Sequence, residues 1–200
     1  VFKMEAIGSD VPANYPVALQ GKTIAGYAVA IENVATGRQT LNTELLTTLT
    51  ETVAGMTNGT QTTDVLLTGL GDVAFKTTYE KWVGEHASAS ENLSAWYIPT
   101  LSQLSAFMGT LFTMKDVPAT GSEDFKNIPE FEFVNGKMFD RETIATVNYA
   151  SSTINNQGNV SGVRINVADG VVTNAQEAGI SVKTALNQQA LCRPMITIFK

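Results

Sequence analysis

Residues 95–104 read Ala95-Trp96-Tyr97-Ile98-Pro99-Thr100-Leu101-Ser102-Gln103-Leu104, and this stretch decides how the fold is organised. Pro99 fixes its own φ angle and biases Ile98 toward extended backbone, so the chain is expected to turn sharply from a strand into a helix. Thr100 stands three residues before Gln103, which is the spacing of a helix capping box. The segment therefore predicts a strand-to-helix corner, with the two aromatic residues ahead of the proline filling the core.

One helix is predicted before this corner and another after it. After the corner, apolar residues recur at three- and four-residue steps: Leu101, Leu104, Phe107, Met108, Leu111 and Phe112. That stripe predicts a core-facing helix over residues 101–114. Upstream, Asp72 is expected to cap a helix with apolar positions Phe75, Tyr79, Trp82 and Val83. Residues 40–63 combine helical leucine spacing with threonines that disfavour helix, which predicts a weak helix or an ordered loop. Two main helices are therefore expected.

Strands are predicted toward both ends of the chain. The apolar runs 24–31 and 195–199 have strand length, Val1–Met4 is a short extended start, and residues 144–149 alternate. Residues 162–172 indicate a hairpin that turns at Asp169-Gly170. Strands, then helices, then strands favour an α+β fold with mixed or antiparallel sheets over a regular βαβ alternation. One domain spanning residues 1–200 is the simplest expectation.

Composition limits the function classes. The 200 residues carry a net charge of −6, which would repel a nucleic-acid backbone, so no nucleic-acid partner is expected. Hydrophobic residues make up 44% and charged residues 16%, which excludes a disordered chain and a coiled coil. No apolar run approaches the ~18 residues of a membrane span. A polar but uncharged surface is common in secreted and surface-displayed proteins, and a start at Val1 is compatible with the loss of a signal peptide.

The residues for metal or redox chemistry are few. The chain has one cysteine, Cys192, and one histidine, His86, so an internal disulfide and Cys/His metal spacings are both excluded. Cys192 lies in an apolar segment and is expected to be a small buried hydrophobe. His86 is expected at the end of a helix, on the surface. The acidic residues of the loop 115–137 lack the spacing of a calcium loop. No catalytic residue, metal or cofactor is predicted.

Three segments resemble the signatures of a known family. Residues 95–104 resemble Trp-Tyr-Leu-Pro-Ser-x-x-Glu-Leu, residues 148–153 (Asn-Tyr-Ala-Ser-Ser-Thr) resemble Tyr-Trp-Ser-Ser-Thr, and residues 191–199 resemble a terminal Val-Arg-Pro-Val-Arg-Ala-Phe strand. These signatures belong to bacterial C-type-lectin-like surface domains associated with fimbrillins and lipoproteins. The chain departs from them at Gln103 (Glu), at Ala150 (Trp) and at residues 195–197 (Val-Arg-Ala).

The resemblance implies a C-type-lectin-like fold in which the two terminal strands, Val1–Met4 and 196–199, pair, so that the termini lie close together. It implies a non-enzymatic recognition or adhesion domain on a cell envelope or phage particle, with an extracellular protein or glycan as ligand. Three alternatives stay open. They are a variable receptor-binding protein of a diversity-generating retroelement, a structural surface module with no small ligand, and an oxidase of the formylglycine-generating type. The oxidases share the fold but use a cysteine pair, which a single cysteine disfavours.

The candidate ligand-binding residues lie between the predicted strands of the C-terminal half, which builds the ligand-facing surface in the resembled fold. They are Tyr149, Asn155, Asn156, Asn159, Arg164 and Gln188. Amide side chains both donate and accept hydrogen bonds, and with tyrosine they are typical contact residues. The alternative is a solvated turn, because asparagine and glycine form turns readily. Ser151-Ser152-Thr153 is expected to hydrogen-bond nearby backbone, and Arg193 to pair a carboxylate or buried carbonyls. If the contacts lie elsewhere, the loop around Glu123 and Asp124 is the next candidate.

Overall fold

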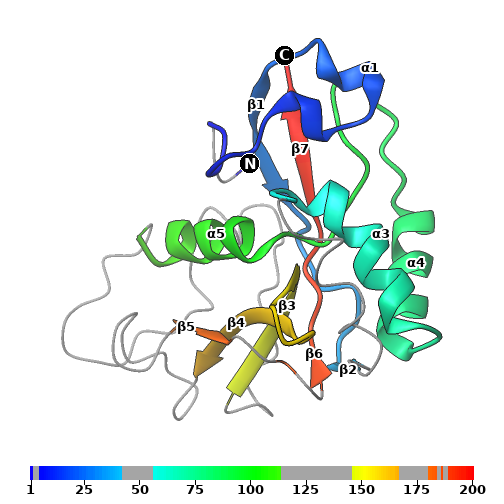
Figure 1. The fold of residues 1–200 in the computed structure, drawn as a ribbon, viewed down its shortest axis with the longest axis vertical. Coiled ribbons are helices and arrows are strands. Elements are labelled where there is room, and N and C mark those ends of the chain that lie inside the picture. The colour runs from blue at the N-terminus through cyan, green and yellow to red at the C-terminus, as the bar shows by residue number, and fades with distance from the viewer. Residues whose placement is uncertain (2–4, 42–55, 114–145, 167–179, 184–185, 187–188) are drawn as a thin grey trace.

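A computed structural model describes residues 1, 5–41, 56–113, 146–166, 180–183, 186 and 189–200 (Figure 1). Within these ranges the fold is mixed α+β, as predicted. The helices are η1 (Pro12–Asn14, a 3-10 turn), α1 (Val17–Gln20), α3 (Gly59–Leu70), α4 (Ala74–Glu85) and α5 (Leu101–Thr113). The strands are β1 (Ile24–Val29), β2 (Gln39–Thr40), β3 (Thr146–Ile154), β4 (Val160–Asn166), β5 (Ile180–Lys183), β6 (Gln189–Ala190) and β7 (Met195–Phe199).

The strands form small antiparallel sheets, ordered β1-β7, β2-β6 and β3-β4-β5. Lys200 and Thr23 exchange two backbone hydrogen bonds, of 2.8 and 2.9 Å, beyond the paired ends of β1 and β7. The Ile7 amide donates to the Tyr27 hydroxyl on β1, so segments from both ends of the chain meet this strand pair (Figure 1). β7 was expected to pair with Val1–Met4. Residues 2–4 lie outside the described ranges, and the partner that the structure gives β7 is β1.

The corner at Pro99 leads into α5 as predicted. The Thr100 amide donates to Gln103 Oε1 at 3.0 Å and the Gln103 amide donates to Thr100 Oγ1 at 3.3 Å, which together form the expected capping box. Leu104, Phe107 and Met108 are buried. The side chains of the last two stripe positions, Leu111 and Phe112, lie outside the described set.

The expectation of two main helices is wrong, because α3 is a third helix of comparable length. Its cap is Asn58, whose side chain accepts from the Gln61 amide at 3.0 Å. Two of the threonines that argued against helix, Thr62 and Thr63, are buried, and their hydroxyls form hydrogen bonds within the helix. Thr62 donates to Asn58 O and Thr63 donates to Gly59 O, each one turn back. Burial of the leucines of α3 therefore overrides the weak propensity of its threonines.

The predicted cap of α4 is also wrong. Val73, in extended backbone at φ −118° and ψ 157°, occupies the N-cap position, and no side chain caps the helix. The helix therefore begins at Ala74, and Asp72 stands one residue too early to accept from its first turn. The apolar face is as expected, because Phe75, Tyr79 and Trp82 are buried.

A large apolar core lies between α3, α4, the corner and the C-terminal strands. It contains Leu41, Leu66, Leu67, Leu70, Phe75, Tyr79, Ile98, Ala150, Ile154, Val160, Leu186, Ala190 and Cys192. Cys192 is thus a small buried hydrophobe, as predicted, and burial raises the pKa of its thiol well above the ordinary range. A second core joins the N-terminal segment to β1 and β7 through Ile7, Tyr15, Leu19, Ile24, Tyr27 and Phe199.

Asp10 is a buried carboxylate at the edge of the second core, with 3% of its surface exposed. Its Oδ2 accepts hydrogen bonds from the hydroxyls of Tyr15 and Tyr27, both at 2.6 Å, and its Oδ1 accepts from Asn58 Nδ2 at 2.9 Å. A buried charge is costly unless hydrogen bonds compensate it, and three donors do so here. Asp10 thereby joins the N-terminal segment, β1 and the start of α3.

A line of buried hydrogen bonds continues from this carboxylate, and we call it the Asp10–Gln103 chain. Thr197 Oγ1 lies 2.8 Å from the hydroxyl of Tyr15 and 2.8 Å from that of Tyr97. Gln103 Nε2 donates to the Tyr97 hydroxyl at 3.2 Å. The chain runs from the N-terminal segment through β7 and the corner to α5.

A glycine pair tests the close packing of α3 against the corner. A Cβ at Gly59 would lie 2.3 Å from Ile98 O and 2.3 Å from a ring carbon of Tyr97, whereas a Cβ at Gly84 meets nothing within 4 Å. Gly59→Ala should lower the free energy of unfolding by about 1–3 kcal/mol. Gly84→Ala should raise it by up to about 1 kcal/mol, because alanine favours helix. Urea unfolding measures both, and equal effects would contradict the packing.

The buried tyrosines predict a loss of stability at high pH. Burial is the main cause that raises the pKa of Tyr15, Tyr27, Tyr79 and Tyr97 in the folded protein. In the unfolded chain they ionise near pH 10, so above that pH unfolding releases protons and stability falls. Each contributes a slope of up to about 1.4 kcal/mol per pH unit. Ionisation of these four tyrosines, followed by tyrosinate absorbance, should therefore accompany unfolding, and their ionisation in a still-folded protein would contradict this.

Candidate functional site

The β3–β4 hairpin carries most of the predicted binding residues. Its register pairs Asn148 with Arg164 and Tyr149 with Val163, and an irregularity follows Ala150 before pairing resumes at Ile154 and Val160. The predicted Asp169-Gly170 turn lies outside the described residues; β4 itself pairs with β3 and β5. The described hairpin therefore turns through residues 155–159, which is the polar stretch singled out in the sequence.

Asn155 holds this turn closed. Its backbone amide donates to Asn159 O at 2.9 Å, and its side-chain Oδ1 accepts from the amides of Gln157 and Asn159, both at 2.9 Å. Gly158 has a φ of 77°, the left-handed conformation that glycine adopts most easily. Asn155 and Asn159 are half-buried, whereas Asn156 and Gln157 are exposed. Asn155 thus has a structural role, and Asn156 and Gln157 present amides to solvent.

Tyr149 is not on the exposed face where it was predicted to lie. Its side chain is fully buried, with 0% exposed. The chain at Leu191 runs beside β3 and joins it through two backbone bonds, from Leu191 N to Asn148 O and from Ala150 N to Leu191 O. This neighbouring segment adds a further strand contact at Tyr149, so the residue is an interior position. The expectation that it contacts a ligand from the surface is corrected.

Arg164 is half-buried in the central strand of the β3-β4-β5 sheet. Its Nε donates to Oδ1 of the cross-strand residue Asn148 at 2.9 Å. The structure therefore joins Arg164 to Asn148, a residue that was not among the predicted binding residues. Cross-strand neighbours share one face of a sheet, so register could have paired them once the hairpin was known. Gln188 lies outside the described residues.

Hydroxyl groups link the two strands of the hairpin and attach it to the rest of the fold. Ser151 Oγ donates to Ser161 O at 2.7 Å, and Ser152 Oγ donates to Ile98 O at 2.8 Å. Thr153 Oγ1 accepts from the Leu101 amide at 2.9 Å. The predicted backbone-bonding role of this serine–threonine segment is confirmed, and its partners include both sides of the corner.

Arg193 likewise has the structural role that was expected for it. Its side chain is 1% exposed, and Nη1 donates to the backbone oxygen of Ala30 at 3.0 Å. It pairs a buried carbonyl, one of the two partners considered, and ties the segment before β7 to the end of β1.

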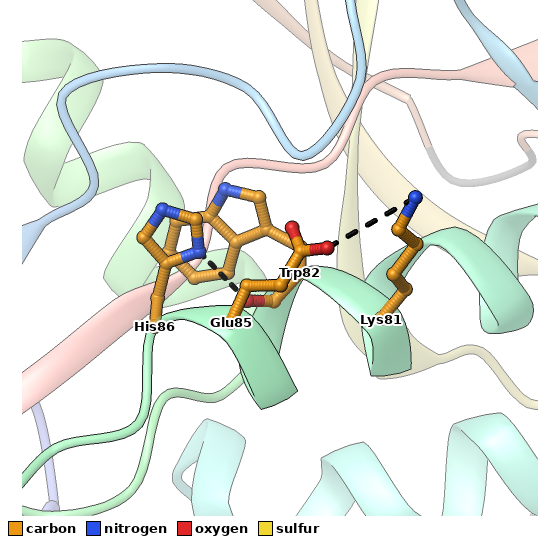
Figure 2. Close-up of polar contacts among 4 residues, drawn as sticks. All are labelled: Lys81, Trp82, Glu85 and His86. Carbon is orange, nitrogen blue, oxygen red and sulfur yellow. Dashed lines mark hydrogen bonds and ion pairs between the residues drawn. The ribbon is translucent and has the colours of Figure 1, made fainter.

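An aromatic cluster lies at the end of α4, and two of its members, Trp82 and His86, are drawn in Figure 2. The His86 ring stacks on Trp82 with centroids 4.2 Å apart, and Trp96 meets Trp82 edge-on at 5.3 Å. His86 Nδ1 lies 2.8 Å from Trp82 O; because a carbonyl only accepts, this nitrogen carries the proton. Trp96 Nε1 donates to His86 O at 2.7 Å, and Trp96 is half-buried rather than a full core residue as expected. The four-residue spacing of Trp82 and His86 was the available signal.

His86 is the exposed C-cap of α4, as predicted. Among the residues that the structure describes, no His, Cys, Asp or Glu cluster has the grouping of a metal site. None of the helices in those ranges combines the length and apolar character needed to cross a membrane. Comparison of the chain with protein-family models, with curated proteins and with solved structures finds no match.

Neighbouring asparagines in the turn give a matched stability test. Asn155→Ala removes an acceptor for two backbone amides and should lower the free energy of unfolding by about 1–2 kcal/mol. Asn156→Ala changes an exposed side chain and should stay within about 0.5 kcal/mol of the wild type. Thermal or urea unfolding separates the two. A cost at Asn156 as large as that at Asn155 would contradict the structural assignment.

Proposed function

We propose that the protein is a non-enzymatic recognition or adhesion domain of the C-type-lectin-like class, displayed on a cell envelope or a phage particle. Its binding surface is the β3–β4 hairpin, with contacts from Asn156, Gln157 and Arg164. The ligand is an extracellular protein or glycan. The observation that carries the proposal is the exposed amide pair on a turn whose shape depends on a different residue, Asn155.

The residues that anchor the hairpin are different from the residues exposed at its tip, and this supports a recognition role. The hydroxyls of Ser152 and Thr153 fix the hairpin to the corner, that of Ser151 links the two strands of the hairpin, and the Asn155 side chain fixes the turn. The side chains of Asn156 and Gln157 contribute to none of these, so they are available for contact at little cost to the fold. Their amides both donate and accept, which suits hydroxyl and peptide groups on a ligand.

The environments of the nucleophilic and basic residues support a non-enzymatic role. Cys192 is the only cysteine in the chain, and its thiol is buried with a raised pKa, opposite to the environment of reactive thiols. The cysteine pair of formylglycine-generating oxidases has no counterpart here. His86, the only histidine, is held by the carbonyl of Trp82 and stacked on its ring.

The proposal predicts binding that depends on the hairpin tip. The wild-type protein should bind ligands on a glycan array or in an immobilised cell-surface extract. Asn156→Ala combined with Gln157→Ala should weaken that binding about tenfold or more, because it removes two amide groups from the contact. Affinity by surface plasmon resonance and stability by thermal unfolding are measured together.

Lys81→Ala is the control for this experiment. Lys81 is exposed on α4 and forms a 4.0 Å ion pair with Glu85, which contributes little to stability. The Lys81→Ala variant should bind like the wild type. If the wild-type protein binds neither the glycan array nor the cell-surface extract, the structural module is favoured. If the double variant keeps full affinity, the contacts lie elsewhere on the protein.

A further inference from the structure

The half-buried guanidinium of Arg164 is held by one hydrogen bond, from Nε to Asn148 Oδ1. Within the described part of the chain the structure gives it no carboxylate partner and no second hydrogen bond. A guanidinium has five N–H donors in a planar fork. With Nε directed at Asn148, the edge formed by Nη1 and Nη2 keeps two parallel donors that the neutral amide does not occupy.

We propose that this edge of Arg164 binds a carboxylate on the ligand, which makes the ligand an acidic carbohydrate. The inference rests on the proposed function and narrows its ligand class. Two parallel N–H donors match the two oxygens of a carboxylate, and such bidentate pairs add geometric specificity as well as energy. Asn148 is the positioning residue, because its amide oxygen fixes the orientation of the fork without neutralising its charge.

The net charge of −6 does not oppose a single carboxylate at this place. At physiological ionic strength, interactions between exposed charges are screened beyond about 8 Å, whereas a bidentate contact acts at about 2.8 Å. A polyanion such as a nucleic acid would be repelled by the net negative charge of the protein. A sugar unit with one carboxylate instead contacts the local positive charge of Arg164.

A carbohydrate fits the surroundings better than a protein partner. Protein interfaces depend on large apolar or aromatic anchors. Among the side chains whose exposure the structure describes, the exposed large hydrophobic residues are Val1, Val11, Val17 and Ile31, and none of them lies in hairpin residues 148–164. The hairpin tip instead offers the amides of Asn156 and Gln157. Arg164 lies four positions beyond Val160, or about 13 Å along the strand, so a ligand that touches the tip and Arg164 is an oligosaccharide.

Glucuronate and glucose form a matched pair of probes, since they differ at the carboxylate. Titration into ¹⁵N-labelled protein, followed at the Nε–H signal of Arg164, should show a shift with glucuronate and none with glucose. Arg164→Gln should weaken glucuronate binding by about 10- to 100-fold. Asn148→Asp should weaken it by a similar factor although Arg164 is still present, because an internal carboxylate then neutralises the guanidinium. Arg38→Gln, at an exposed arginine of the 30–40 segment, should bind like the wild type.

Thermal unfolding of each variant confirms that it is folded, and Asn148→Asp should be at least as stable as the wild type because it creates an ion pair. Undiminished glucuronate binding in Arg164→Gln would overturn the proposal, as would a wild-type protein that binds glucuronate no better than glucose. Tighter binding of acetylglycine than of glucuronate would overturn the carbohydrate assignment and indicate a peptide carboxylate. If the Asn156/Gln157 double variant no longer binds a neutral glycan of the array and Arg164→Gln still binds it, the proposed function stands and this inference fails.

Discussion

The direction of each hydrogen bond in the Asp10–Gln103 chain is fixed by its carboxylate end, and the packing of the domain depends on it. The Tyr15 proton points to Asp10, so the contact between Tyr15 and Thr197 must use the proton of Thr197. The Tyr97 hydroxyl then donates its proton to Thr197 Oγ1, and the Gln103 side-chain amide donates to the Tyr97 oxygen. One ordered set of donors thus joins the N-terminal segment, β7, the corner and α5. Each group is buried, so each missing partner would carry the full cost of desolvation.

Glutamine at position 103 supplies the last donor in this ordered set of hydrogen bonds. Its Oε1 accepts from the amides of Gly59 and Thr100, both at 3.0 Å, while its Nε2 donates to Tyr97. Glutamate, which stands here in the pattern that the segment resembles, accepts at both oxygens when ionised. The Tyr97 hydroxyl would then donate to the glutamate. Thr197 would have to donate to both Tyr15 and Tyr97, which its single proton cannot do. The departure from the pattern is therefore matched to the hydrogen-bond network around it.

Local patterns predicted the parts of the fold that local physics determines. The proline corner, the capping box of α5 and the backbone-bonding serines each follow from a few consecutive residues. The third helix was missed because the propensity of its threonines is weak and its stability comes from tertiary burial. Tyr149 was misplaced because its burial depends on Leu191, more than forty positions later. Asp10 gave no signal at all, since an isolated acid near a chain end is usually exposed and its partner Asn58 is distant in sequence.

The closed turn at the hairpin tip also makes the domain a scaffold for engineering. Asn155 N and Asn159 O are already hydrogen-bonded at 2.9 Å, so the chain enters and leaves the tip at one fixed point. A peptide inserted between Asn156 and Gln157 would lengthen a loop whose ends are held, and the entropy of closing such a loop grows only slowly with its length. The same geometry that exposes two amides therefore offers a display site at which foreign sequences are carried away from the core.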